Sequence, residues 1–267
     1  MRQIDSETLS LAHRLADAAG EVIRPYFRRP IAVTDKKALV GGKTVFDPVT
    51  AADRNAEQAI REILARERPN DAVLGEEFGE TTGTSGWRWV LDPVDGTRAF
   101  VNGRYEWGSL IALEREGVPV LGVMDQPVLG ERFVGANGET RLHDRGGVRA
   151  VHVRDCATIA DAILCATHPD AFYRDEERAA FGRVKFATLM HRWGGDCTIF
   201  GILAMGFADL IVESGFNRWD VAALVPIVEG AGGVITNWQG GSCAEGGPCL
   251  AAGDARVHAE AMTLLNA

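Results

Sequence analysis

Long apolar runs are missing from this 267-residue sequence. No stretch of eighteen apolar residues occurs, and a helix needs about that length to cross a bilayer. The first residues are polar and acidic, without the basic and then apolar order of a secretory signal. We therefore expect a protein that has no membrane partner and that acts in the cytoplasm.

Cysteine is scarce and irregularly placed. The chain has five, at positions 156, 165, 197, 243 and 249, and no Cys-x-x-Cys pair. An odd number without such pairs indicates neither a disulfide framework nor a zinc site. A reducing compartment fits this usage.

An excess of basic residues is also absent. Lysine and arginine number 28 against 37 aspartates and glutamates, so the formal net charge is −9. This balance disfavours binding to nucleic acid, because nothing offsets the charge of a phosphate backbone. An acidic protein that handled a small phosphate would need a cation from elsewhere, which indicates a metal.

The hydrophobic pattern predicts a mixed α/β protein. Helical spacing is found at residues 6–26, 50–66, 197–205, 221–230 and 256–265. Strand patterns are found at residues 73–74, 87–91, 163–166, 184–188 and 210–213, with an antiparallel meander over 109–134. We expect one catalytic unit with a cleft between an N-terminal half, residues 1–150, and a C-terminal α/β half, residues 151–267.

The segment Leu-Asp-Pro-Val-Asp-Gly-Thr at 91–97 carries the strongest chemical signal. It places Asp92 and Asp95 at the end of an apolar strand, and the intervening proline fixes the turn. Gly96 lets the backbone approach a ligand closely. From Thr97 a helix can begin, and its exposed N–H groups suit a phosphate oxygen. A hairpin turn is the simpler reading of Asp95–Gly96 alone.

Other acidic residues have ordinary interpretations when each is taken alone. Glu76 and Glu77 follow a short strand and a glycine, as in a solvated turn. Asp220 stands where it could cap the helix that follows. Asp53 lies three residues after Thr50, in the spacing of a capping box. Their joint occurrence beside the 91–97 segment is poorly explained by separate structural roles.

Three motifs together resemble the inositol monophosphatase family, in its order and spacing and over nearly the whole chain. They are Gly-Glu-Glu at 75–77, the 91–97 segment, and Trp-Asp-Val-Ala-Ala at 219–223 followed by Glu-Gly-Ala-Gly-Gly at 229–233. The resemblance implies a layered αβαβα sandwich and a small phosphate monoester as substrate. It also implies two or three Mg²⁺ ions and a homodimer.

The same resemblance implies the role of each site residue. The metal ligands would be Glu76, Asp92, the carbonyl of Val94, Asp95 and Asp220. The attacking water would be positioned and deprotonated by Glu76, Thr97 and Asp53. The phosphate would be held by the N–H groups of Gly96 and Thr97. Lys43 would lie near a third, weaker metal, and Glu77 is a further candidate. Independently, four carboxylates in one cleft repel one another unless about two Mg²⁺ ions offset them, and paired metals suit in-line attack by water.

The run Gly-Gly-Asp-Cys at 194–197 is similar to the histidinol-phosphate phosphatase branch of the family. Asp196 is an acid where inositol-type members usually carry a small neutral residue. With Glu213, it would suit the ammonium and imidazole groups of histidinol phosphate. The simpler alternatives are a helix cap for Asp196 and a solvated strand end for Glu213.

Other functions stay open at this point. Within the family, the substrate could be inositol 1-phosphate or another sugar or nucleotide phosphate. An aspartyl-phosphate mechanism wants Asp-x-Asp-x-Thr, whereas this chain has Asp-x-x-Asp-Gly-Thr. A third possibility is a non-catalytic protein that binds metal or phosphate, against which the full set of expected ligands argues.

Overall fold

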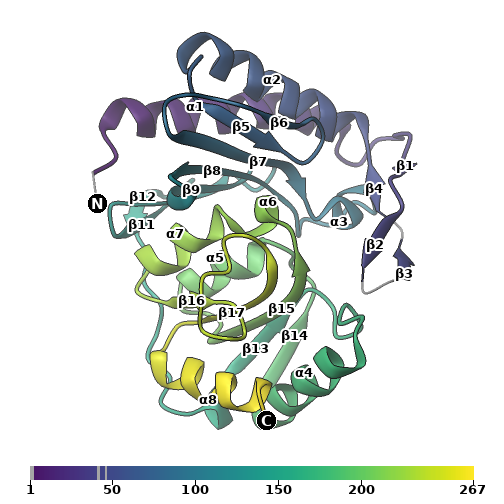
Figure 1. The fold of residues 1–267 in the computed structure, drawn as a ribbon, viewed down its shortest axis with the longest axis vertical. Helices are drawn as coiled ribbons and strands as arrows, with labels where there is room; N and C mark the ends of the chain where they lie inside the picture. The colour runs from purple at the N-terminus through teal and green to yellow at the C-terminus, as the bar shows by residue number, and fades with distance from the viewer. Residues whose placement is uncertain (1–2, 41–42, 46) are drawn as a thin grey trace.

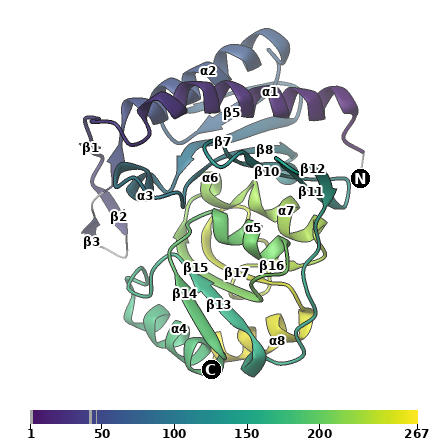
Figure 2. The same cartoon turned by 180° about the vertical axis from the view of Figure 1, so that it is seen from behind.

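The structure, a computed structural model, describes residues 3–40, 43–45 and 47–267. Helices and sheets alternate in layers from top to bottom in Figure 1, and Figure 2 shows the same order from behind. Helices α1 and α2 form one outer layer and α4 and α8 the other. Helices α5, α6 and α7 lie between the two sheets. This is the layered αβαβα sandwich that the resemblance implies, so the predicted fold class is confirmed.

The helices begin and end as follows: α1 Ser6–Ile23, α2 Ala51–Glu67, α3 Thr97–Val101, α4 Asp175–Ala187, α5 Thr198–Ala204, α6 Arg218–Val221, α7 Leu224–Gly230 and α8 Ala255–Leu265, with 3₁₀ turns η1 Arg24–Tyr26 and η2 Ile159–Asp161. Asp5 caps α1 through its side chain, and Pro25 occupies the turn that follows the helix. Thr50 and Asp53 form the predicted capping box at the start of α2.

The larger sheet has the strand order β12-β11-β10-β9-β8-β7-β5-β6. Its strands are β5 Ala72–Gly75, β6 Gly79–Thr81, β7 Trp87–Asp95, β8 Gly108–Arg115, β9 Val118–Gln126, β10 Glu131–Ala136, β11 Glu139–Asp144 and β12 Gly147–Ala150. Strands β8 to β10 are the predicted antiparallel meander. Strand β5 runs parallel to β7, so Gly75 ends beside Leu91 and the following Glu76 comes close to Asp92.

The smaller sheet has the order β14-β13-β15-β17-β16. Its strands are β13 Ile163–Ala166, β14 Met190–Trp193, β15 Leu210–Phe216, β16 Val234–Thr236 and β17 Gly247–Ala252. Strand β13 is parallel to both of its neighbours, so their carboxyl ends lie at one edge. Two short pairs precede α2: β1 Thr34–Asp35 with β4 Pro48–Val49, and β2 Ala38–Val40 with β3 Lys43–Val45.

The buried hydrophobic residues that the structure describes form three clusters. Buried residues of α1 and α2 pack on the larger sheet, those of α5 to α7 fill the space between the sheets, and those of α4 and α8 cover the smaller sheet. The middle layer of helices packs closely on β9. At Gly122 there is no room for a side chain, since a methyl group there would overlap the carbonyl oxygen of Ala223. Backbone contact of this kind fixes the α6–α7 junction on the larger sheet.

Three predicted elements differ from the structure. Residues 184–188 form the end of α4 and the turn after it, so the predicted strand there is wrong. The helix predicted for 221–230 is two helices, α6 and α7, joined by Ala222 and Ala223. Strand β7 continues past Leu91 as far as Asp95.

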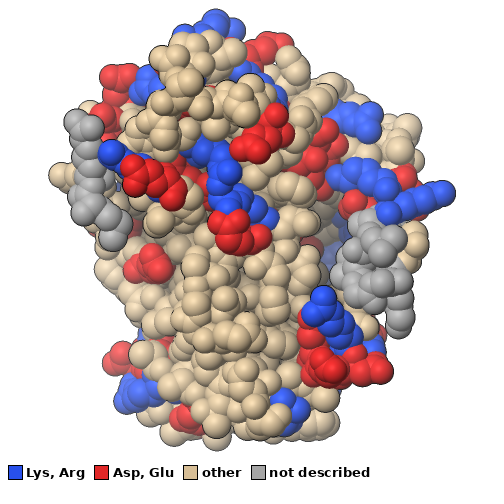
Figure 3. Space-filling view, viewed as in Figure 1, with Lys and Arg blue, Asp and Glu red and all other residues tan. Residues whose placement is uncertain are grey.

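In the described part of the chain, no helix is both long and apolar enough to cross a membrane. On the face drawn in Figure 3, lysines and arginines are mixed with acidic residues over the upper half, and a broad uncharged area lies below. The side chains visible there therefore form no continuous basic surface, in keeping with the net charge of −9.

Candidate active site

An irregularity at the end of β7 turns Asp92 and Asp95 to the same side. Residues three apart in a regular strand point to opposite faces of the sheet. Here the register with β8 shifts between Asp92 and Asp95, as in a β-bulge. The Val94 N–H donates to Asp92 Oδ1 at 3.1 Å and so holds the distorted turn. Pro93 breaks the regular ladder at this point because it has no N–H.

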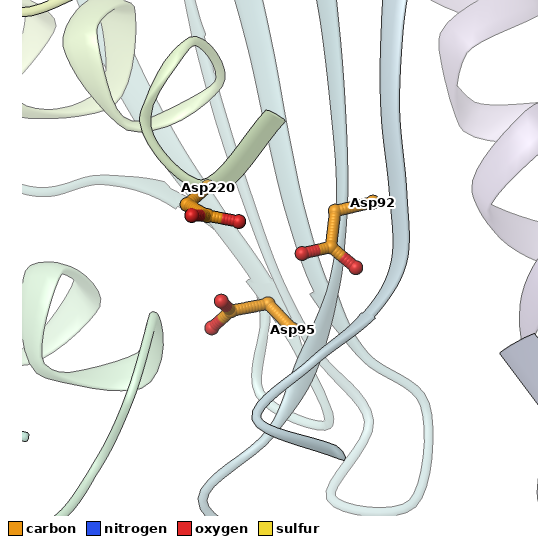
Figure 4. Close-up of side chains that lie close together, drawn as sticks. All are labelled: Asp92, Asp95 and Asp220. Carbon is orange, nitrogen blue, oxygen red and sulfur yellow. The ribbon is translucent and has the colours of Figure 1, made fainter. Parts of the chain in front are cut away.

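Asp220 comes to the same place from the other half of the chain. It stands in the first turn of α6 and completes a capping box, accepting from the backbone N–H of Asn217 at 2.6 Å. Carboxylate oxygens of Asp92, Asp95 and Asp220 lie within 4.8 Å of one another, and Figure 4 shows the three side chains converging. Asp220 is therefore not a simple N-cap, since Asn217 has that position.

Burial and mutual repulsion disfavour the ionised forms of the three carboxylates. Burial raises the pKa of Asp92 well above its usual range, and the charges of Glu76, Asp95 and Asp220 raise it further. Burial and the charge of Asp95 likewise raise the pKa of Asp220. Burial also raises the pKa of Asp95, against the effect of the Cys197 N–H, which donates to Asp95 Oδ2 at 2.7 Å. Only a nearby positive charge would allow all three to ionise at neutral pH.

Glu76 and Glu77 lie beside this cluster and share a lysine. Lys36 Nζ donates to Glu76 Oε1 at 2.6 Å and to Glu77 Oε1 at 3.0 Å. Burial raises the pKa of Glu76 to about 7, although Lys36 opposes that shift. Lys43, the lysine named from the sequence, belongs to β3, and its side chain lies outside what the structure describes.

Asp53 and Thr97, to which the family resemblance gives a shared role, are in contact. Thr97 Oγ1 lies 3.3 Å from Asp53 Oδ1 and 2.9 Å from the carbonyl oxygen of Val94. The Thr97 hydroxyl has a single proton, so it can donate a hydrogen bond to only one of these acceptors at a time. Asp53 is buried and is held by Thr50, whose backbone N–H and hydroxyl both donate to Asp53 Oδ2. The capping box therefore also orients a site residue.

Gly96 joins β7 to α3 in a conformation that favours glycine. Its φ is +84°, in the left-handed region, and a Cβ there would lie 2.7 Å from the carbonyl oxygen of Glu106. The first N–H groups of a helix have no acceptor within the helix. The start of α3 consequently presents backbone donors beside the carboxylate cluster.

Asp196 and Glu213 form a second acidic pair on the same cavity. Asp196 has φ +42°, and α5 begins after it with Cys197 at the N-cap, so the predicted alternative that Asp196 caps this helix is wrong. Burial raises the pKa of Asp196 to about 8, with the charges of Asp95 and Glu213 adding to the shift. Glu213 is buried on β15, accepts from the Thr167 N–H at 2.5 Å, and has its pKa raised by burial to about 7. It is therefore not a solvated strand end.

One cavity of about 400 Å³ brings most of these groups together. The site residues expected from the sequence that line this cavity are Glu76, Asp92, Val94, Asp95, Gly96, Thr97, Asp196, Glu213 and Asp220. Asp53 reaches the cavity through Thr97. The polar lining residues that were not named as site residues from the sequence include Lys36, Asp47, Arg98, Thr167, Tyr173 and Asn217. Of these, Arg98 directly follows the 91–97 segment and Asn217 has capping-box spacing to Asp220, so both had a local signal.

Comparison with known proteins supports one family. The sequence model of the inositol monophosphatase family matches residues 5–267. The chloroplastic bifunctional phosphatase IMPL2 of Arabidopsis thaliana is 38% identical over 275 residues, covering 96% of this chain and 74% of that protein. The histidinol-phosphatase of Mycobacterium tuberculosis is 36% identical over 263 residues, or 98% of both chains. A solved structure of an inositol monophosphatase from Zymomonas mobilis has a TM-score of 0.86 at 40% identity, covering 100% of both chains.

Proposed function

The chain belongs to the inositol monophosphatase family of phosphatases, and from that premise we propose that it hydrolyses L-histidinol phosphate to L-histidinol with Mg²⁺. The observation that carries the proposal is the cavity itself. It contains a cluster of three aspartates that suits a metal ion, and separately the pair of Asp196 and Glu213, which suits a cationic substrate.

The side chains in the first group fit a divalent cation. The oxygens of Asp92, Asp95 and Asp220 are hard donors grouped within 4.8 Å, and they need a counter-charge to ionise together. We assign the metal to these three, with Glu76 and the Val94 carbonyl as further ligands. When bound, two or three Mg²⁺ ions would acidify a water molecule and offset the charge of the phosphate.

The residues around the three aspartates then have defined roles in the reaction. When the Thr97 hydroxyl donates to Asp53, its lone pairs can accept a hydrogen bond from the attacking water. Asp53 and Glu76 are the carboxylates that can take up the proton. The Gly96 and Thr97 N–H groups at the start of α3 would hold a phosphate oxygen. No aspartyl-phosphate intermediate is needed.

The second acidic pair supports the choice of substrate. Histidinol phosphate carries an ammonium and an imidazole, and both Asp196 and Glu213 face the cavity that would receive them. A hydrogen bond between charged groups is stronger than one between neutral groups. The name of the M. tuberculosis relative agrees with this substrate.

An inositol phosphate is the second candidate, favoured by the name of the Zymomonas structure. The test is phosphate release with and without EDTA from histidinol phosphate, inositol 1-phosphate, fructose bisphosphate and adenosine bisphosphate. We expect histidinol phosphate to have the highest kcat/KM and EDTA to abolish release. Preference for inositol 1-phosphate would replace the substrate, and no release with Mg²⁺ present would favour a non-catalytic protein.

We also propose a homodimer in a reducing cytoplasm. The dimer is proposed from membership of the family. Light scattering after size exclusion measures the mass in solution, and a mass near 28.8 kDa, that of one chain, would contradict it. The compartment is supported by the five cysteines, each of which is free and buried.

A further inference from the structure

The acidic cluster combines residues from two separate parts of the fold. Asp92 and Asp95 belong to β7 of the larger sheet, whereas Asp220 belongs to α6, which lies between the sheets (Figures 1 and 2). The capping box with Asn217 orients the Asp220 side chain on its own helix but does not place that helix against β7. A helix of four residues is also too short to be stable by itself. The close packing of the α6–α7 junction on β9 seats the end of this helix, and a side-chain contact is needed to hold its first turn, which carries Asp220, at a set distance from the strand.

A buried carboxylate on the larger sheet provides that link. Glu114 of β8 is 0% exposed and accepts hydrogen bonds from two arginines. Arg88, its partner on β7, donates through Nε and Nη2 at 2.8 and 2.6 Å. Arg218, two residues before Asp220, donates through Nη1 to Glu114 Oε2 at 2.8 Å and to Oε1 at 3.1 Å.

Arg218 is not required to neutralise Glu114. Arg88 already gives the carboxylate an ionic partner within the same sheet, which meets the need of a buried charge. Arg218 is itself only 13% exposed, and its Nη2 group pairs with Glu245 in the loop before β17. Its guanidinium therefore connects α6 to the larger sheet on one side and to the loop before β17 on the other.

We propose that the Arg218–Glu114 ion pair is a positioning contact that holds Asp220 at the right distance from Asp92 and Asp95, and so sets the affinity of the cluster for a divalent cation. The proposal rests on the metal site proposed above. Arg218 acts through the backbone of α6 and touches no reacting atom.

The sign of the expected effect separates positioning from electrostatics. Removing a positive charge near an acidic cluster should, by Coulomb's law alone, strengthen cation binding. Losing the correct placement of Asp220 should weaken it. Groups hydrogen-bonded to a metal ligand typically contribute about 10- to 100-fold in metal affinity, and Arg218, which acts through the helix backbone instead, should contribute at the low end of this range.

The experiment compares Arg218→Met with Arg88→Met in the full-length protein. Each removes one guanidinium from the same Glu114 and keeps an apolar stem. Mg²⁺ affinity is measured by titration calorimetry, and thermal unfolding is followed in EDTA. We expect Arg218→Met to weaken Mg²⁺ binding about tenfold, at the low end of that range. We expect Arg88→Met to leave the affinity within about twofold, because α6 keeps its contact, while the melting temperature of both variants falls.

Arg218→Lys serves if the Met variant does not fold. Its ammonium keeps the charge but not both contacts, so its affinity should fall between those of the wild type and the Met variant. Unchanged or tighter binding in the Arg218 variants, or equal weakening in Arg88→Met, would overturn the positioning role alone. A wild type that binds no Mg²⁺, or whose binding is unaffected by Asp220→Asn, would overturn the metal site and this proposal together.

Discussion

Asp95 is the residue whose loss should be most informative about chemistry. In Asp95→Asn the amide oxygen can still accept the Cys197 N–H, so the fold should be kept. A neutral amide cannot replace the carboxylate in offsetting the charge of a metal ion. Because even the hydrogen-bonding partners of metal ligands contribute up to about a hundredfold, we expect loss of this ligand to lower kcat at least about a hundredfold. Phosphate release at saturating Mg²⁺ measures it, with the melting temperature in EDTA as the control. Near-normal turnover of the folded variant would rule out the metal assignment.

Asp196 allows a matching test of substrate choice. Its φ of +42° is tolerated by asparagine better than by alanine, so Asp196→Asn removes the carboxyl group with little backbone strain. A hydrogen bond to a charged group contributes about 1.5–3 kcal/mol, and about 1.4 kcal/mol is tenfold. We therefore expect kcat/KM for histidinol phosphate to fall roughly ten- to a hundredfold.

The control for Asp196→Asn is a substrate with a neutral head group, glycerol phosphate. Its hydrolysis should hardly change, because the metal and phosphate contacts are untouched. Equal losses on both substrates would mean that Asp196 does not recognise the cationic part of histidinol phosphate.

The sequence predicted these site residues unequally well, for physical reasons. Asp92, Asp95 and Gly96 stand in one local segment whose order implies their proximity. The positive φ of Asp196 depends on how the 194–197 turn meets the rest of the fold, so the sequence leaves a helix cap open as an alternative. Lys36 reaches Glu76 because β1 pairs with β4, and nothing local distinguishes it from neighbouring lysines.

The packing of the middle helices on β9 gives a prediction about stability. Gly122→Ala should destabilise the protein by about 1–3 kcal/mol or more, because the methyl group would overlap the Ala223 carbonyl. Gly182→Ala in α4 is the matched control. A methyl group there meets nothing within 4 Å, and alanine is favoured over glycine in a helix by about 0.5–1 kcal/mol. Chemical denaturation should give opposite signs; a neutral Gly122→Ala would contradict the close packing.

The elements that sequence reasoning missed show where local patterns fail. Residues 184–188 read as a strand, yet Phe181 and Val184 are three apart and buried on one face of α4, while Phe186 is 85% exposed. A helical signal was present, since three acids occupy the first turn of α4, where they suit the helix dipole. The sequence gives less indication of the bulge in β7, because a register shift is defined relative to the partner strand. The boundary near residue 150 stays a prediction.

Across the full chain, the concentration of buried acids makes stability depend on pH and metal. In the metal-free fold, the pKa of Glu76 and of Glu213 is raised to about 7 and that of Asp196 to about 8. The ordinary values lie near 4. Between those limits these three groups bind more protons in the folded state than in the unfolded state, so their contribution to stability is fully present near pH 4 and is lost as the pH rises through 7 and 8. Burial lowers the pKa of His13, His143 and His258 from the ordinary 6.5, which opposes this loss below about pH 6.5, so the loss is expected mainly above that pH. The carboxyl groups with a lowered pKa, which are Asp35, Glu106, Asp144 and Asp254, act below about pH 4.5 and so outside this interval.

We therefore expect the melting temperature in EDTA to fall by on the order of 5 °C between pH 5 and pH 8. Saturating Mg²⁺ should largely remove this fall, since a bound cation favours the ionised carboxylates. Glu213→Gln takes away one of the three groups without touching a proposed metal ligand, so its metal-free protein should lose less stability over the same range. A melting temperature in EDTA that rises steadily from pH 5 to pH 8 would show that these carboxylates are already compensated within the protein, and would remove the electrostatic reason for placing a metal among them.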